Sequence, residues 1–147
     1  MKKIIIYIFL SFIFTTVLSA QSFEKIKLTA DELPQGYKIS PNPECLSTQA
    51  CTFYNNPETY SALIGDVKFK DVQNIDGDRD SGSIMYFEFS EKFKMESFLK
   101  GLLWGGDKPS ELHPEEFFIK DNILIVYSFP LDSAIKEVLK KKVKKEF

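Results

Sequence analysis

Residues 115–129, EEFFIKDNILIVYSF, decide the fold of this chain. Two mostly apolar segments, residues 115–120 and 123–129, are separated by Asp121-Asn122, and both of these residue types tolerate positive φ in tight turns. The pattern predicts a β-hairpin. Because the second segment is almost entirely apolar, we expect it to be a strand in the centre of a sheet.

A similar arrangement precedes this hairpin. Residues 62–75 are extended in character, residues 76–82 (DGDRDSG) form a turn-rich break, and residues 83–89 (SIMYFEF) read as the returning strand. In the returning strand, Met85 and Phe87 share one face while Ile84 and Tyr86 share the other. We therefore expect this strand to be partly buried on both sides.

Each hairpin is followed by a segment with helical periodicity. Ser90 is a candidate N-cap for the first helix, whose apolar residues lie between 95 and 103, and Gly105-Gly106 should end it. Asp132 or Ser133 can cap the second helix, with Ile135, Val138, Leu139 and Val143 as its buried stripe. The ββαββα order predicts an α+β two-layer sandwich, with both helices on one apolar face of an antiparallel sheet or at its ends.

The N-terminus has the three parts of a secretory signal peptide. Lys2-Lys3 precede an apolar run of about 17 residues, and small residues follow at its end. We expect cleavage after Ala20, with Ser19 as the second choice and an uncleaved membrane anchor as the alternative. The mature protein is thus predicted to be periplasmic or extracellular. Residues 21–61, a polar lead, a strand at 36–40 and a cysteine-containing loop, should belong to the same domain as the core at 62–147.

Cys45 and Cys51 enclose five residues and are the two cysteines of the chain. In an oxidising compartment they should form a disulfide that rigidifies the irregular stretch between Pro41 and Pro57. A redox pair is less consistent with the sequence, because thiol-exchange motifs separate their cysteines by two residues at a helix start.

The charge distribution limits the class of partner. Without Lys2 and Lys3 the chain has 17 basic and 21 acidic side chains, a formal net charge of −4. Residues 132–147 hold six lysines against three acidic residues, so the rest of the mature chain is strongly acidic. We expect no nucleic-acid partner, since such binding needs a basic contact surface. The lysine-rich helix provides at most weak contact with an anionic membrane.

The strongest candidate for a metal site is the acidic turn Asp76, Asp78 and Asp80, together with Glu88. Alternating carboxylates bring several hard oxygens together, as calcium requires. The residues expected at later positions of the calcium loop of helix-loop-helix sensors are displaced by one, so an ordinary hairpin turn without an ion is the competing interpretation. We expect no cofactor, with calcium as the alternative.

Catalytic motifs are scarce in this sequence. It contains one histidine, His113, on a polar connection, and no G-x-S-x-G, H-E-x-x-H or phosphate-binding glycine loop. Four aromatic residues on loop-like segments, Phe53, Tyr54, Tyr60 and Trp104, are candidates for a binding surface, or else they cap the core.

These observations predict an exported binding module that recognises a protein partner, such as an inhibitor or immunity-type protein, with no catalytic residues assigned. The alternative is a calcium-dependent or carboxylate-based glycan-binding protein or hydrolase.

Overall fold

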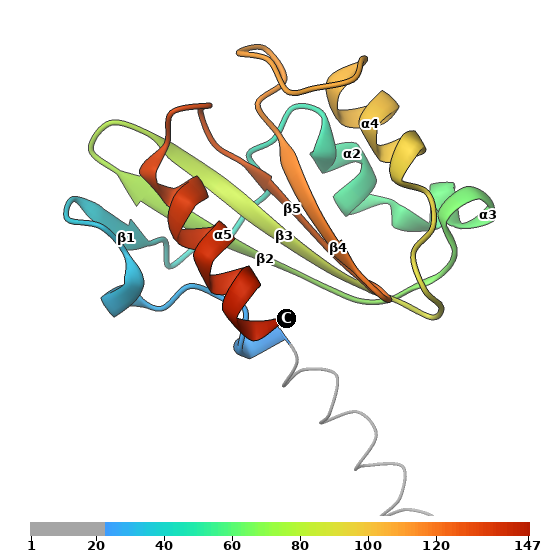
Figure 1. Cartoon of the computed structure of the whole chain (residues 1–147), viewed down its shortest axis with the longest axis horizontal. Coiled ribbons are helices and arrows are strands. Elements are labelled where there is room, and N and C mark those ends of the chain that lie inside the picture. The colour runs from blue at the N-terminus through green and yellow to red at the C-terminus, as the bar shows by residue number, and fades with distance from the viewer. Residues whose placement is uncertain (1–22) are drawn as a thin grey trace, which may run out of the picture.

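The computed structural model describes residues 23–147 as a five-stranded antiparallel sheet with helices packed on it (Figure 1). In chain order, with η for the short 3-10 helices, the elements are η1 (Ala30–Glu32), β1 (Tyr37–Ile39), α2 (Ala50–Asn55), η2 (Pro57–Tyr60), α3 (Ser61–Ile64), β2 (Val67–Gly77), β3 (Ser81–Phe89), α4 (Glu96–Trp104), β4 (Glu116–Lys120), β5 (Ile123–Ser128) and α5 (Ala134–Glu146). The predicted signal peptide lies outside the described residues. Within them, no helix is long and apolar enough to span a membrane.

The strand order is β1-β2-β3-β5-β4, so the two predicted hairpins meet along β3 and β5. Tyr86 of β3 lies opposite Asp71 of β2 on one side and Ile125 of β5 on the other. The turn between β4 and β5 is built as expected, because Asp121 has a φ of 53°. The α+β class, the antiparallel hairpins and the ββαββα order of the C-terminal part are confirmed.

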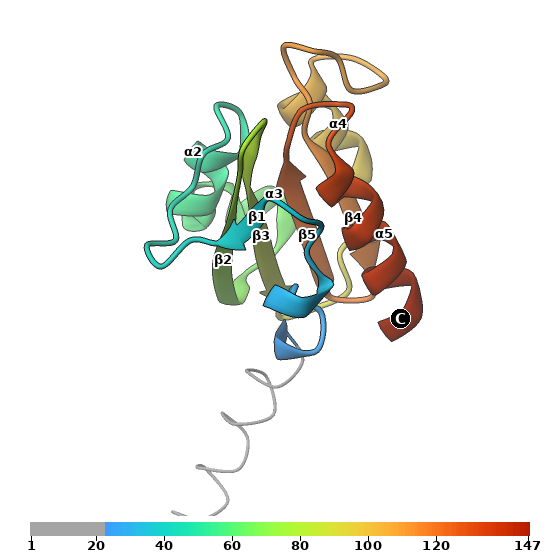
Figure 2. The ribbon, with the colours of Figure 1, turned by 90° about the vertical axis from the view of Figure 1, so that its left-hand side faces the viewer.

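Both faces of the central strands are buried, as predicted for residues 83–89. Ile84 and Tyr86 belong to one apolar cluster, and Met85 and Phe87 belong to another on the opposite face. The first cluster includes Leu139 and its neighbours on α5, which crosses in front of the sheet in Figure 1. The second includes buried residues of α2, α3 and α4, and Figure 2 shows α2 and α5 on opposite sides of the sheet.

The distribution of the helices between two faces differs from our expectation that they share a face or lie at its ends. The reason lies in β3 and β5, whose side chains are apolar in both directions. Since each face of these strands must be removed from water, one helix cannot cover both. Helix α5 covers one face, and α4 with the helices of residues 50–64 covers the other.

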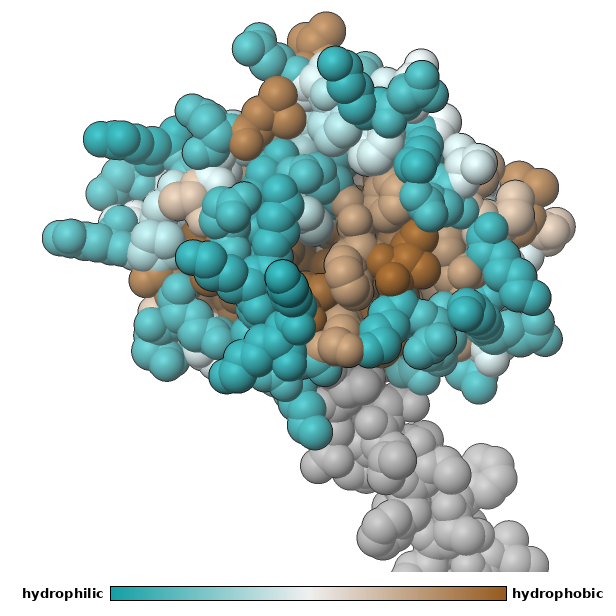
Figure 3. Space-filling model, viewed as in Figure 1, coloured by the Kyte–Doolittle hydropathy of each residue, from teal (hydrophilic) through white to brown (hydrophobic). Residues whose placement is uncertain are grey.

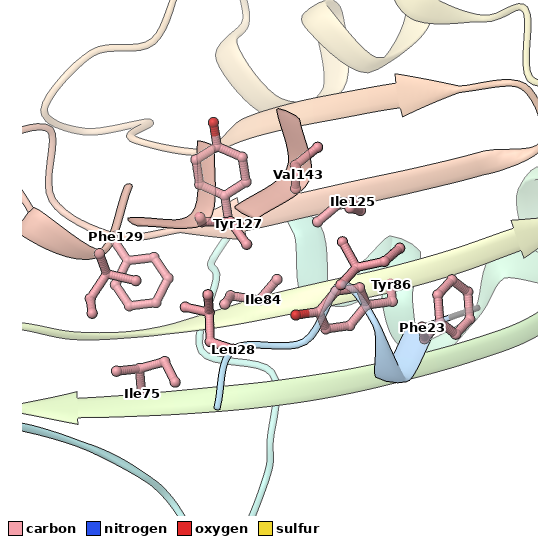
Figure 4. Close-up of a cluster of buried hydrophobic side chains, with 12 residues drawn as sticks. Phe23, Leu28, Ile75, Ile84, Tyr86, Ile125, Tyr127, Phe129 and Val143 are labelled. Carbon is pink, nitrogen blue, oxygen red and sulfur yellow. The ribbon is translucent and has the colours of Figure 1, made fainter. Parts of the chain in front are cut away.

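The segment after the signal peptide contributes to the core, although we expected only a polar lead. Phe23, Ile26 and Leu28 are each 1% exposed and belong to the same cluster as α5 (Figure 4). Gln73 of β2 fixes this segment, because its side chain accepts a hydrogen bond from Leu28 N at 3.1 Å and donates one to Leu28 O at 2.7 Å. The first hydrophobic cluster is therefore closed by both ends of the described chain.

Two further local predictions are wrong. Residues 50–61, expected as a loop with possible short strands, and residues 62–64, expected to be extended, form α2, η2 and α3. Ser90 does not cap α4, since its backbone N–H donates to Asp66 O and Met95 occupies the N-cap position.

Two predicted helix ends are confirmed. Gly105 ends α4 with a φ of 61°. The Ser133 side chain accepts a hydrogen bond from Ile135 N at the start of α5.

Candidate functional site

The predicted disulfide is present and ties a short ring onto the end of the sheet. Cys45 and Cys51 are joined with a Cα–Cα distance of 5.5 Å, and α2 begins inside the ring. The ring is held to β3, because Leu46 N donates to Ser83 Oγ at 3.2 Å. Ser47 Oγ accepts a hydrogen bond from Ala50 N at 2.8 Å. The disulfide and these bonds hold the backbone that carries Leu46, whose side chain is exposed at the surface.

An open depression of about 700 Å³ lies beside this ring, where four segments meet. We call it the loop groove. It is lined by Leu46 and Thr48 of the disulfide ring, Ser81 and Gly82 of β3, Glu111, Leu112, Pro114 and Glu115 of the α4–β4 connection, and residues 128–132 at and after the end of β5. The sequence pattern did not predict that these four segments meet, since they are separated by up to 86 positions.

Exposed leucines surround the loop groove. Leu46, Leu112 and Leu131 are 46%, 84% and 47% exposed, and each comes from a different segment. Figure 3 shows brown atoms protruding at the top of the molecule, over the α4–β4 and β5–α5 connections. Of the five large hydrophobic side chains that are exposed among the described residues, these three lie on one groove. A cluster of this kind is typical of a binding surface.

The wall of the loop groove contains a buried carboxylate. Glu115 is 2% exposed, and its Oε1 accepts a hydrogen bond from Ser47 Oγ at 2.7 Å. Its Oε2 has no hydrogen-bond partner among the described residues. Buried polar atoms are nearly always paired in folded proteins, so Oε2, which is itself buried, is an exception within the wall of the groove.

The α4–β4 connection is long, yet its last residues are held by side chains from two helices. Trp104 Nε1 donates to Glu115 O at 2.7 Å, and the indole ring stacks on Phe117 with centroids 5.4 Å apart. Lys136 of α5 is buried, and its Nζ donates to Pro114 O at 2.8 Å and lies 2.9 Å from Glu116 Oε2. The groove wall is therefore preorganised. Lys136 was not expected to be buried, because its neighbours in sequence form the lysine-rich surface of the helix.

The aromatic residues predicted as a binding surface lie instead against the second hydrophobic cluster. Phe53 is fully buried and its ring centroid is 4.7 Å from that of Phe87. Tyr54 and Tyr60 are half-buried, and Tyr54 lies beneath Lys70 Nζ at 4.9 Å from the ring centroid. Trp104 is half-buried and donates its one N–H internally. These positions match the alternative interpretation, in which aromatic side chains close the end of the core.

The acidic residues proposed as calcium ligands are divided between two places. Asp76, next to the last residue of β2, pairs with Ser81, and Asp80 accepts a hydrogen bond from the Tyr37 hydroxyl, which raises the pKa of Tyr37. Glu88 lies at the other end of β3, about 23 Å away at 3.3 Å per residue. Asp78 is exposed in the turn. Across residues 23–147, no group of three or more His, Cys, Asp or Glu side chains is placed to hold a metal ion.

The lysines of α5 are partly engaged within the molecule. Lys140 lies 3.3 Å from Glu116 Oε1, and Lys142 lies 2.7 Å from Glu32 Oε1 in η1. Together with buried Lys136, half of the helix's six lysines thus contact acidic side chains of the protein itself. This arrangement reduces the positive charge that the helix presents to an anionic surface.

His113, the one histidine of the sequence, does not line the loop groove. His113 is half-buried, and its backbone N–H and C=O both bond to Ser110 in a tight turn outside the groove lining.

No protein-family model, curated protein or solved structure matches the chain.

Proposed function

We propose that this protein is an exported binding module that recognises another protein through the loop groove. The observation that carries the proposal is the cluster formed by Leu46, Leu112 and Leu131, three exposed leucines that line a single groove. Apolar side chains exposed around a depression gain free energy when a partner removes them from water. An inhibitor or immunity-type role is the narrower form of this proposal.

The rigidity of the groove supports protein recognition. The disulfide fixes the ring that contains Leu46, and Lys136 and Trp104 hold the wall at Pro114 and Glu115. A preorganised surface loses less conformational entropy on binding, so more of the contact energy appears as affinity. Export is supported by the pattern of residues 1–20 and by the disulfide, since such bonds persist in oxidising compartments.

The test compares capture of a partner by three forms of the oxidised protein. Wild type, Leu112→Asp and Leu63→Asp are used as baits on cell-envelope and secreted fractions. Leu63 is the matched control, because it is 55% exposed but lies outside the groove. We expect one stoichiometric partner with wild type and Leu63→Asp, and its loss with Leu112→Asp. Retention of the partner by Leu112→Asp would contradict the proposal, as would turnover of a substrate by the purified protein.

The same experiment includes the alternative, a calcium-dependent or carboxylate-based glycan-binding protein or hydrolase. Each capture is repeated with calcium and with chelator, and the Asp78→Asn/Asp80→Asn double variant is added. Calcium-dependent capture that disappears in this variant would favour the alternative. Capture that is indifferent to both changes would favour the loop groove.

A further inference from the structure

We infer that β4 is an edge at which a second copy of this chain adds its own β4 in antiparallel orientation. Strand β4 is the last in the order β1-β2-β3-β5-β4, so one of its edges has no neighbouring strand among residues 23–147. At the opposite end of the sheet β1 has three residues, a length that limits strand pairing. Because residues 116–120 do not line the loop groove, this inference is independent of the proposed function.

The hydrogen bonds of β5 determine which backbone groups of β4 point outward. Phe89 N donates to Asn122 O at 2.8 Å, so the even-numbered residues of β5 direct their backbone groups toward β3. The odd-numbered residues of β5 therefore face β4, and the strand register pairs them with the even-numbered residues of β4. Phe117 and Ile119 consequently direct their N–H and C=O groups toward the open edge, where a further strand can bond to them.

The sequence of β4, EFFIK, is complementary to itself when two copies run antiparallel. With Phe118 opposite its own copy, each Glu116 faces Lys120 of the other molecule. Each Phe117 likewise faces Ile119, and this pair can exchange both backbone hydrogen bonds. Opposite charges are favourable when directly opposite in a sheet and like charges are unfavourable, so a parallel pair with Glu116 beside Glu116 is disfavoured. The antiparallel pair has two-fold symmetry and closes at a dimer.

The surface beside this edge is apolar. Phe118 is partly exposed and stacks on Phe147 with ring centroids 5.6 Å apart, and Ile123 is partly exposed on the same face of the sheet. Figure 3 shows brown and tan atoms in the middle of the view, over β4 and beside α5. Since Phe118 would lie at the two-fold axis, strand pairing would bring the two apolar patches together and remove them from water.

Both charged residues of β4 are accessible to a second copy. Lys120 is exposed, and its Nζ lies 5.3 Å from the centroid of the Phe147 ring. The Glu116 side chain is 24% exposed and already contacts Lys136 and Lys140 of α5. A carboxylate offers about four acceptor sites, so Glu116 has capacity for one more ammonium group.

Sedimentation equilibrium of the oxidised protein, residues 21–147, measures the association. We expect a reversible monomer–dimer equilibrium between about 1 and 500 µM, a range suited to an interface at or below the standard size. Amide hydrogen exchange locates the contact. At high protein concentration, exchange should slow at Phe117 and Ile119 and stay unchanged at Phe118, whose N–H faces β5.

Exchanging the charges tests the register. Lys120→Glu places carboxylates opposite each other at both ends of the strand pair and should weaken dimerisation about tenfold or more. Glu116→Lys does the same with ammonium groups. A mixture of the two variants restores both opposite-charge pairs, so it should dimerise about as strongly as wild type although neither variant does so alone. Lys68→Glu, which changes an exposed lysine of β2, is the control and should leave the dissociation constant unchanged.

Three results would overturn the inference: a monomer at every concentration, a dimer that Lys120→Glu does not weaken, or a mixture of the two folded variants that associates no more strongly than either alone. Should Glu116→Lys fail to fold because Glu116 contacts α5, Lys120→Glu and the exchange at Phe117 and Ile119 decide the question. The capture experiment with Leu112→Asp judges the proposed function separately, since Leu112 lies outside β4.

Discussion

Lys136→Met tests how strongly a buried ammonium group holds the wall of the loop groove. The Lys136 side chain is 3% exposed, lies 2.9 Å from Glu116 Oε2 and donates to Pro114 O at 2.8 Å. Lys140 lies one helical turn later, 3.3 Å from the other oxygen of Glu116, with its side chain 47% exposed. Lys140→Met is therefore a matched control that changes the same residue type, on the same helix, beside the same carboxylate.

The expected magnitudes follow from burial. A hydrogen bond to a charged group contributes about 1.5–3 kcal/mol, and a buried carbonyl left without a donor costs about 1–3 kcal/mol. Glu116 keeps Lys140 in the Lys136→Met variant, and methionine retains the apolar contacts of the lysine stem. We therefore expect a loss of about 2–4 kcal/mol in the free energy of unfolding. An exposed ion pair contributes about 0.2–1 kcal/mol, so Lys140→Met should lose no more than about 1 kcal/mol.

Urea denaturation of the oxidised variants measures both losses, and amide exchange at residues 111–115 reports the groove wall directly. Exchange should accelerate in Lys136→Met and remain unchanged in Lys140→Met. Losses that agree within about 0.5 kcal/mol would refute the reasoning, as would a Lys136→Met variant that is as stable as wild type. The second result would mean that the desolvation cost of the ammonium group offsets its hydrogen bonds.

Three further perturbations have defined outcomes. Replacing Cys45 and Cys51 by serine should lower the free energy of unfolding in urea by about 2.4 kcal/mol, the loop-entropy value for a seven-residue ring. Gly82→Ala should strongly destabilise the fold, because the added Cβ would lie 2.1 Å from a carbonyl oxygen of β5. Gly101→Ala meets open space on α4 and should stabilise the fold by about 0.5–1 kcal/mol, so equal thermal midpoints of the two variants would contradict this reasoning. Burial raises the pKa of Tyr127, so the neutral phenol is favoured in the fold and stability is lost as the pH rises above about 10; Tyr127→Phe should move the alkaline unfolding midpoint, followed by circular dichroism, to higher pH.

The regular parts of the fold were predictable because their determinants are local. The turn at Asp121 and the alternation of residues 83–89 specify the hairpins through backbone preferences and a period of two. The cap at Ser133 and the terminator at Gly105 act within one helical turn. The Cys45–Cys51 pairing needed only proximity in sequence. Each of these features depends on a few residues that are close together in the sequence, so it can be predicted without knowing the tertiary structure.

The features that failed depend on distant contacts. Residues 50–61 have no clear apolar period and residues 62–64 resemble the start of a strand, yet both stretches are helical, and Ala50, Phe53 and Ile64 pack in the second hydrophobic cluster. The N-terminal lead looked polar, yet Phe23 and Ile26 bury their side chains against strands more than 40 positions away. Sequence patterns describe a segment's own composition and not the surface that it will meet.

The candidate site was the least predictable feature. Its leucines are single apolar residues in polar connections, a pattern that is unremarkable along the chain. The unpaired Oε2 of Glu115 is a property of the assembled structure, since four segments must converge before any atom there has or lacks a partner. One signal was available in the sequence: Leu112 stands alone among polar residues on a long connection, where no strand or helix would bury it.

The strand order also determines how the chain reaches this structure. Strands β2 and β3, and likewise β4 and β5, are joined by short turns, whereas residues 90–122 lie between β3 and β5. Closing that long loop costs entropy before its pairing gives any stabilisation, so docking of the two hairpins is expected to limit the folding rate. Because β3 and β5 each belong to both hydrophobic clusters, that one step assembles both faces together. The two sides of the sheet should consequently form and unfold as one cooperative unit.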